Sequence, residues 1–333
     1  MALPDGRVLW LYGDTYTGRT ASDGSLAPGW RLVHNSFILQ DGACFHPIMG
    51  GSPDARSDLI PAPAGEWYWP TAGVVEPTPS GDVLRVFSYH ETHSAGPAPF
   101  NLVLLDMQIT TFTLPDLRFV GTQALPNRIG SDQTHPWGQA ALVVGSTPTP
   151  TVYVFGRGTD PNATGPDAGR DHRVARVALG SLTTGPWQFY NGGTTGTAAD
   201  WSSDPTAAAL VTFVADSPAL PSGISAKPYD PMFVVPRPSG GYLAVGKLGE
   251  VVPGIFGTEI SAWTAATPEG PWHYEGKIAA TSIPGNQYSY GARLELNLPG
   301  GTPIVLYSVS SFDDVTKDPS LYGVKFEAPS AIP

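Results

Sequence analysis

The feature of this sequence that most limits its fold is the recurrence of short β-branched and aromatic runs separated by glycine and proline. Apolar or alternating runs of roughly four to eight residues, bounded by such turn formers, are typical of strands. Longer helical stretches are interrupted throughout, because an internal Gly costs a helix about 1 kcal/mol and an internal Pro about 3 kcal/mol. The 39 Gly and 35 Pro residues exceed a fifth of the 333-residue chain, while charged residues make up only 14%. The sequence therefore predicts an all-β protein with many short strands and tight turns.

The predicted strands fall into groups of four that recur every roughly 60 to 80 residues, the size of one blade of a β-propeller. The first complete group comprises Trp67–Glu76, Val83–His90, Asn101–Leu105 with Ile109–Phe112, and Arg118–Ala124. The second comprises Pro136–Val144, Val152–Arg157, His172–Leu179 and Trp187–Tyr190. The third comprises Pro228–Val235, Tyr242–Lys247, Glu259–Thr264 and Trp272–Glu275.

A repeated motif supports this grouping. The segments Leu182–Tyr190 and Pro268–Tyr274 both contain Gly-Pro-Trp-x-aromatic at the same place in successive groups. We expect Trp187 and Trp272 to pack on outer strands rather than to contact a ligand.

The two ends of the chain carry incomplete groups. The predicted strands there are Val8–Tyr12, Val33–Leu39 and Cys44–Ile48 at the beginning, and Tyr288–Leu296, Pro303–Ser310 and Leu321–Phe326 at the end. Residues 5–14 resemble residues 80–89, where a turn feeds the second strand of a group, so the innermost strand of blade one would lie before Met1 or be absent. We expect one domain over residues 1–333, a five-bladed β-propeller whose first blade lacks its innermost strand.

Charge and cysteine content exclude several classes of function. The net charge is −11 and there is no basic stripe, which argues against nucleic acid and anionic membranes as partners. No apolar run reaches the roughly 18 residues of a membrane span, so we expect no membrane insertion. The one cysteine, Cys44, lies beside Ala43 and Phe45 and is expected to be a buried thiol. No metal or other cofactor is expected. We expect secretion or cell-surface display, although no export signal opens the sequence and a cytoplasmic location stays open.

In a propeller, the start of the first strand and the end of the second strand of each blade lie on one face. Those positions collect aromatic, imidazole, carboxylate and amide groups, which suit a sugar because ring faces stack while hydroxyls form directional hydrogen bonds. The set is Asp14, His34, Asn35, Trp69, His90, Glu91, His135, Trp137, Gln139, Arg157, Tyr229, Asp230, Lys247, Tyr290 and Arg293.

Two aspartates of this set are candidate catalytic groups. Asp14 either acts on a substrate or closes a turn after Gly13. Asp230 follows Tyr229, and burial there would raise its pKa, as a general acid requires. Among the tryptophans we expect Trp69 rather than Trp67 to face the cleft, because neighbouring strand residues alternate sides. Glu76 would lie on the opposite face of the molecule.

The segments Leu3–Gly18 and Val33–Phe37 resemble actinobacterial five-bladed propellers of formerly unknown function, a group that includes the endo-D-arabinanases. Trp67–Pro70, the Gly-Pro-Trp motifs and Asp318–Tyr322 are similar to the same group. The resemblance implies a retaining glycoside hydrolase in which Asp14 is the acid/base. The family's other catalytic aspartate, in a Thr-Asp-Leu-Gly stretch, would fall before Met1. A retaining enzyme needs two carboxylates about 5 Å apart, so an upstream residue or Asp230 would have to supply the partner.

Our leading hypothesis is a glycoside hydrolase that acts on a furanosidic, arabinan-like polysaccharide, with Asp14 and Asp230 as the candidate catalytic residues. Two alternatives remain open at this stage. One is a propeller that binds carbohydrate without cleaving it, and the other is a scaffold for protein partners, which would show a large apolar patch instead of a polar cleft.

Overall fold

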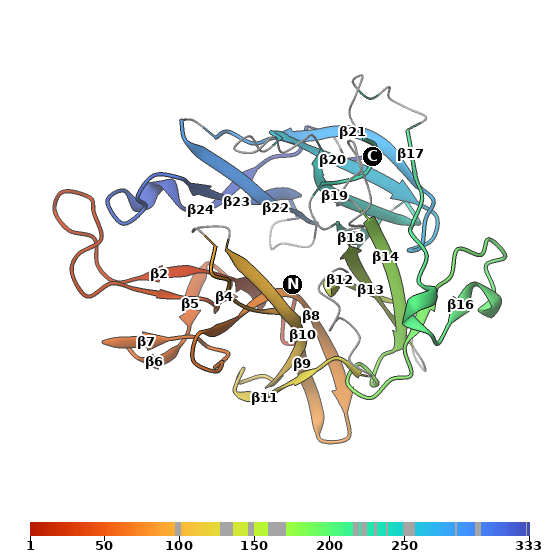
Figure 1. Ribbon diagram of the computed structural model, residues 1–333, viewed down its shortest axis with the longest axis horizontal. Helices are drawn as coiled ribbons and strands as arrows, with labels where there is room; N and C mark the ends of the chain where they lie inside the picture. Colours follow the sequence, from red (N-terminus) through yellow and green to blue (C-terminus); the bar gives the residue numbers. More distant parts are fainter. Residues whose placement is uncertain are drawn as a thin grey trace. The chain divides into compact units, whose positions relative to one another are not determined.

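The computed structural model confirms an all-β chain (Figure 1). It describes residues 1–96, 101–126, 136–145, 150–158, 171–215, 220, 225–229, 232–237, 239–248, 257–283, 285–296, 301–330 and 332–333. Within these residues the helices are 3-10 turns of three residues each: η3 (Ala198–Asp200), η4 (Pro205–Ala207) and η5 (Pro319–Leu321). In the part of the chain so described, no helix has the length and apolar character needed to cross a bilayer.

The first sheet has the order β1-β4-β5, formed by β1 (Val8–Tyr12), β4 (Ser36–Asp41) and β5 (Cys44–Ile48). Two hairpins that the sequence did not predict accompany it. Strands β2 (Thr15–Thr17) and β3 (Arg31–Val33) form one, and β6 (Gly50–Ser52) and β7 (Ala55–Ser57) form the other. The predicted strand Val33–Leu39 is therefore divided between β3 and β4.

The second sheet has the order β11-β10-β9-β8. Its strands are β8 (Glu66–Thr78), β9 (Gly81–His93), β10 (Leu102–Thr113) and β11 (Phe119–Ala124). The two predicted segments of the third strand are one continuous strand, β10, with a register shift between Leu104 and Asp106.

The third and fourth sheets each contain a fifth strand beyond the predicted four. The third sheet runs through β12 (Trp137–Val144), β13 (Thr151–Gly158), β14 (Asp171–Ala178), β15 (Gln188–Tyr190) and β16 (Trp201–Ser202). The fourth has the order β17-β21-β20-β19-β18, with β17 (Phe213–Val214), β18 (Phe233–Pro236), β19 (Tyr242–Leu248), β20 (Glu259–Ala265) and β21 (Trp272–Ala280). Strand β17 pairs with β21 in parallel, whereas the other pairs are antiparallel.

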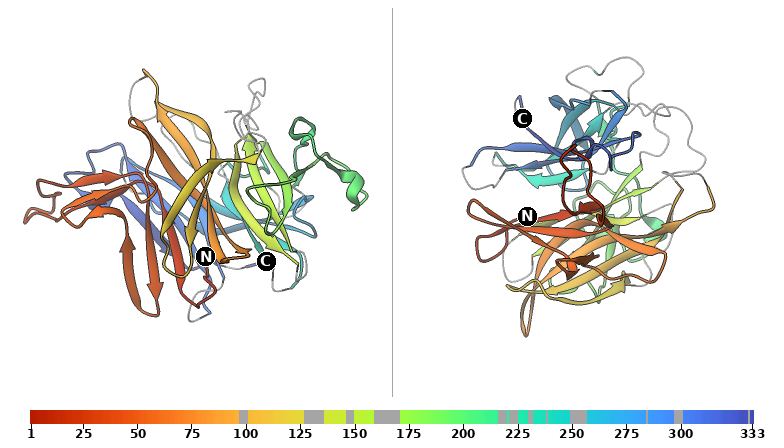
Figure 2. Two further views of the ribbon diagram at one scale, coloured as in Figure 1. Left: turned by 90° about the horizontal axis from the view of Figure 1, so that it is seen from below. Right: turned by 90° about the vertical axis from the view of Figure 1, so that its left-hand side faces the viewer.

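The fifth sheet has three strands, β22 (Gln287–Glu295), β23 (Ile304–Ser311) and β24 (Gly323–Glu327). Neighbouring strands within each sheet are twisted relative to one another, as L-amino acids favour (Figure 2).

The chain divides into two compact units, and each has its own apolar core. Unit 1 comprises residues 1–19, 28–154 and 176–188, and unit 2 comprises residues 20–27, 155–175 and 189–333. The core of unit 1 includes Leu9, Phe37, Leu84, Val86 and Phe112, which project from one face of their strands. The core of unit 2 is formed in the same way by Leu243, Val245, Ile260, Leu294, Val305 and Tyr307.

Buried positions agree with the sequence at the two repeat tryptophans but not at the cysteine. Trp187 and Trp272 are both buried, as predicted. The prediction of a buried Cys44 is wrong, because the residue is exposed on β5, the edge strand of its sheet, beside an exposed Phe45.

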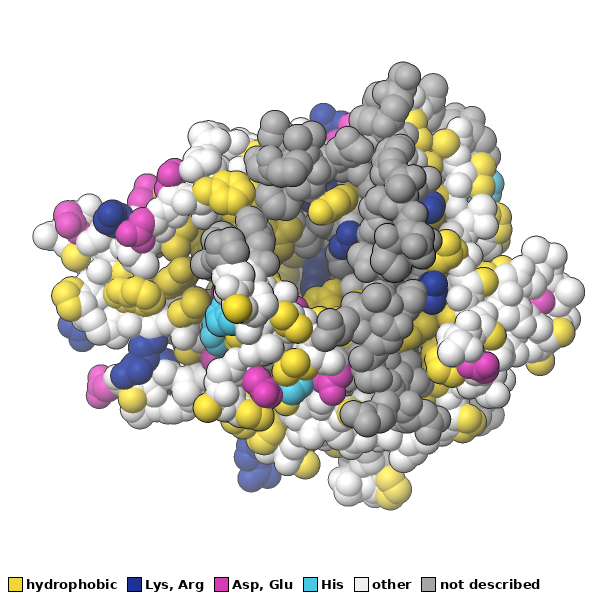
Figure 3. All heavy atoms as spheres, in the orientation of Figure 1, with side chains coloured by type: hydrophobic (Ala, Val, Ile, Leu, Met, Phe, Trp, Pro, Cys, Tyr) yellow, Lys and Arg dark blue, Asp and Glu magenta, His cyan; other side chains and the backbone are white. Residues whose placement is uncertain are grey.

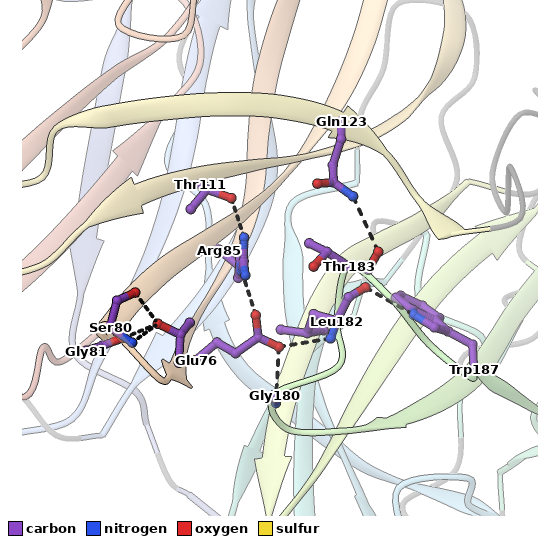
Figure 4. Close-up of polar contacts among 11 residues, drawn as sticks. Glu76, Ser80, Gly81, Arg85, Thr111, Gln123, Gly180, Leu182, Thr183 and Trp187 are labelled. Atoms are coloured by element: carbon purple, nitrogen blue, oxygen red, sulfur yellow. Dashed lines mark hydrogen bonds and ion pairs between the residues drawn. The ribbon is translucent and has the colours of Figure 1, made fainter.

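Glu76 forms a buried structural network (Figure 4). Its Oε2 accepts a hydrogen bond from Nε of Arg85 at 2.6 Å, and Arg85 also donates to the hydroxyl of Thr111. Its Oε1 accepts from the backbone N–H groups of Gly180 and Leu182 at 3.1 and 2.9 Å. Glu76 therefore ties the second sheet to the turn before β15.

Candidate functional site

The candidate site in unit 1 begins at the base of the β2–β3 hairpin. Asp14 directly precedes β2 and His34 directly follows β3, so the hairpin brings them together. The Nδ1 atom of His34 lies 2.8 Å from Oδ1 of Asp14. The indole N–H of Trp69, on β8, donates to the same oxygen at 2.8 Å. Three residues selected from the sequence thus meet at one carboxylate oxygen.

A second carboxylate, Asp58, contacts the same histidine. The backbone N–H of His34 donates to Oδ1 of Asp58 at 2.7 Å. Burial raises the pKa of Asp58, against the hydrogen bond from His34, which lowers it. Burial alone would lower the pKa of His34, but the hydrogen bond and the charge of Asp14 outweigh that effect and raise it. Sequence reasoning missed Asp58, since nothing in its local sequence marks it.

Glu91 is the third carboxylate of the site. It lies on β9 directly opposite Trp67 on β8, and only 8% of its surface is exposed. Its Oε2 atom is buried and has no hydrogen-bond partner among the residues that the structure describes. Burial, with a smaller contribution from the charge of Asp14, raises the pKa of Glu91 to about 7. Near neutral pH, Glu91 therefore holds a proton that an ordinary glutamate has already lost.

Aromatic rings surround these groups. The ring centroid of Trp67 lies 5.0 Å from that of His34, 4.6 Å from that of His93 and 5.8 Å from that of Trp69. Trp67 itself is buried, whereas Trp69 is partly exposed and contacts Asp14. Trp67, whose buried ring these rings surround, lies on the strand opposite Glu91. This apolar surrounding explains the desolvation of the Glu91 carboxyl group.

Two other residues of the predicted set have structural contacts. Asn35 is fully buried, and its side chain bonds the backbone of Ile60 and Tyr68. His90 projects from the face of β9 opposite to Glu91, with Nε2 2.7 Å from Glu66 and Nδ1 3.0 Å from Asp106. The side-chain hydrogen bonds of Asn35 and His90 therefore go to residues other than Asp14, His34 and Glu91.

The remaining members of the set are distributed between the units. In unit 1, Trp137 is buried and Gln139 is partly buried on β12. In unit 2, the guanidinium of Arg157 lies 5.2 Å from the ring of Tyr229, and that of Arg293 lies 5.7 Å from the ring of Phe233.

Also in unit 2, Lys247 is buried and donates to the carbonyl and hydroxyl oxygens of Ser289 at 2.5 and 2.7 Å, while Tyr290 is exposed. His135 and Asp230 lie outside the described residues.

The arrangement in unit 1 suits proton transfer. A carboxyl group that is still protonated near pH 7 and a second carboxyl held by two N–H donors can act as acid and as base or nucleophile. In the described part of the chain, no group of three or more His, Cys, Asp or Glu residues has the geometry to hold a metal ion.

Comparison with known families decides the relationship of the chain. A family model described as "Domain of unknown function (DUF5005)" matches residues 1–307. The chain belongs to this family. No curated protein matches this DUF5005 chain.

The DUF5005 chain is similar to solved structures over nearly its whole length. A putative hydrolase from Bacteroides ovatus is 14% identical with a TM-score of 0.68, over 98% of this chain and 83% of that one. A GH43_1 enzyme from Xanthomonas citri complexed with xylotriose is 14% identical with a TM-score of 0.51, over 96% and 87% of the two chains. A glycoside hydrolase family 43 arabinoxylan arabinofuranohydrolase from Bacillus subtilis in complex with cellotetraose is 14% identical with a TM-score of 0.50, over 100% and 65%. The likeness confirms the predicted fold, a five-bladed β-propeller.

Proposed function

We propose that this DUF5005 chain is a glycoside hydrolase, with Glu91 as the general acid and Asp14 as the second catalytic carboxylate. The observation that carries the proposal is the buried carboxyl group of Glu91, whose pKa is raised partly by the charge of Asp14. Burial keeps Glu91 protonated up to about pH 7, while Asp14 accepts hydrogen bonds from Trp69 and His34. Cleavage of a glycosidic bond by most glycoside hydrolases uses one carboxylic acid and one carboxylate.

In this scheme Glu91 donates its proton to the glycosidic oxygen as the bond to the anomeric carbon breaks. Asp14 attacks that carbon, and water then releases the sugar with Glu91 acting as base, so that the anomeric configuration is retained. This assignment differs from the acid/base role that the family resemblance implied for Asp14, and the burial of Glu91 supports it. Trp69 and His34 hold Asp14 in position, and His34 in turn is held by Asp58.

We further propose an arabinan-like, furanosidic polysaccharide as the substrate, degraded by a secreted or cell-surface protein. Two observations support this choice. The Leu3–Gly18 and Val33–Phe37 segments resemble the endo-D-arabinanases. One similar structure belongs to an arabinoxylan arabinofuranohydrolase.

The test is incubation of the protein with arabinan, arabinoxylan and xylan, followed by measurement of new reducing ends. We expect activity on arabinan, loss of that activity in Asp14→Asn and Glu91→Gln, and normal activity in the control Asp82→Asn, an exposed carboxylate on the same strand as Glu91. Proton NMR of the first product anomer would show retention. The proposal fails if the unaltered protein cleaves none of the glycans, or if both site variants remain fully active.

A further inference from the structure

The β2–β3 hairpin presents one face that continues from the candidate site. The register of the hairpin places Tyr16 opposite Leu32. If the same register continues two residues beyond this pair on either side, Asp14 lies opposite His34 and Gly18 lies opposite Trp30. Two contacts agree with this extension. Asp14 and His34 are 2.8 Å apart, and a β-carbon at residue 18 would lie 3.0 Å from Cα of Trp30. Because side chains two residues apart share one face of a strand, the three pairs lie on the same face.

This face, formed by Tyr16, Trp30 and Leu32 and here named the hairpin ledge, is apolar and open to solvent. Trp30 is 38% exposed and Leu32 is 36% exposed, and the rings of Tyr16 and Trp30 are 5.6 Å apart. On the opposite face of the hairpin, Val33 is buried whereas Arg31 is exposed. Hydrophobic side chains lie over the hairpin at the left of the molecule (Figure 3).

The dimensions of the ledge suit a sugar chain. From residue 14 to residue 18 the strand advances about 3.4 Å per residue, so the ledge extends roughly 14 Å from the carboxylate of Asp14. That length accommodates more than one sugar residue beside the bond to be cleaved. Aromatic rings of Tyr and Trp offer flat apolar faces for stacking together with polar edges that sugars can meet. Gly18 adds no side chain opposite the indole of Trp30.

We infer that the hairpin ledge binds the sugar residues that flank the cleaved bond, and so sets a preference for long glycan chains over short ones. The inference rests on the proposed function, because it takes Asp14 to be the catalytic end of the ledge. The absence of charge on the ledge residues favours an uncharged glycan as the ligand, because no charged group then has to lose its water on binding.

The test compares polymeric arabinan with the shortest oligosaccharide that the protein cleaves. We expect Trp30→Ala to lower kcat/KM for the polymer about tenfold, mainly through KM, and to leave the short substrate within about twofold, as loss of one stacked ring implies. Trp30→Phe should recover most of the loss, because it restores a ring. The matched control is Phe45→Ala, which removes an exposed aromatic ring from β5 of the same unit. Melting temperatures of all variants check that they fold.

Binding measurements separate this inference from the proposed function. In the Glu91→Gln background, affinity for polymeric arabinan should fall about tenfold when Trp30→Ala is added. If the unaltered protein binds arabinan through Trp30 but does not cleave it, the proposed function is wrong while the hairpin ledge remains a glycan-binding site. Equal loss on long and short substrates, no loss at all, or a change of oligomeric state on gel filtration would overturn the ledge as a glycan site.

Discussion

Replacing Glu91 with glutamine tests the protonation state of the site without requiring a substrate. Glutamine has the shape of a protonated glutamate and does not titrate. In the folded chain the pKa of Glu91 rises from 4.5 to about 7 because the side chain is buried and lies near the charge of Asp14. Between these two pH values the folded protein keeps a proton that the unfolded chain has released, so the free energy of unfolding falls as pH rises.

The size of the effect follows from that difference. A pKa rise of about 2.5 corresponds to a loss of about 3 kcal/mol from the free energy of unfolding. This loss is absent below pH 4.5 and complete above pH 7. Glu91→Gln removes this component. It should therefore match the unaltered protein near pH 4 and be about 3 kcal/mol more stable near pH 8. With an unfolding entropy of about 2.1 cal/mol/K per residue, a 333-residue chain should gain about 4 °C in Tm at pH 8.

The assay is thermal unfolding of both proteins in buffers from pH 4 to pH 8. Changes in the pKa of His34 and Asp58 affect both proteins, so the difference between the two curves isolates Glu91. Asp82→Asn serves as the control, because it removes an exposed carboxylate from the same strand. If the difference between Glu91→Gln and the unaltered protein is the same at pH 4 and pH 8, then Glu91 is not protonated in the folded state and the reasoning is wrong.

Three further predictions concern other contacts in the structure. Asp14→Asn should lower glycan hydrolysis at least about 100-fold while sparing glycan affinity, as measured by reducing-end release and by isothermal titration. Trp69→Phe removes the N–H that donates to Asp14 and should lower kcat roughly 10- to 100-fold, with a smaller change in KM. Glu76→Ala should cost about 3 to 5 kcal/mol of stability in urea unfolding, because it leaves the charge of Arg85 buried without its partner. An unchanged kcat in Trp69→Phe, or an unchanged urea midpoint in Glu76→Ala, would contradict the corresponding contact.

Strand periodicity predicted the fold well where strands were long, and less well at the edges of the sheets. The segments Glu66–Thr78 and Gly81–His93 contain aromatic and β-branched runs long enough to mark both strands. Strands β16 and β17 contain two residues each, too few for any pattern. Cys44 was misjudged for a related reason, since an apolar neighbourhood in sequence does not reveal that a strand lies at the edge of its sheet.

For the candidate site, sequence position brought Asp14, His34, Trp69 and Glu91 into consideration but did not distinguish their roles. His90 and Glu91 are adjacent, and alternation alone places them on opposite faces of β9 without saying which face meets Asp14. Asp58 carried no local signal, because its contact with His34 joins residues 24 positions apart.

The sequence by itself determined the class of structure and its repeating unit, because strand alternation and Gly or Pro turns are properties of a few neighbouring residues. Only the tertiary structure decided that the pKa of Glu91 lies far above that of an ordinary glutamate. A pKa depends on how far a group is removed from water and on the charges around it, and at Glu91 those conditions come from Trp67 and Asp14, which folding brings from other strands and loops.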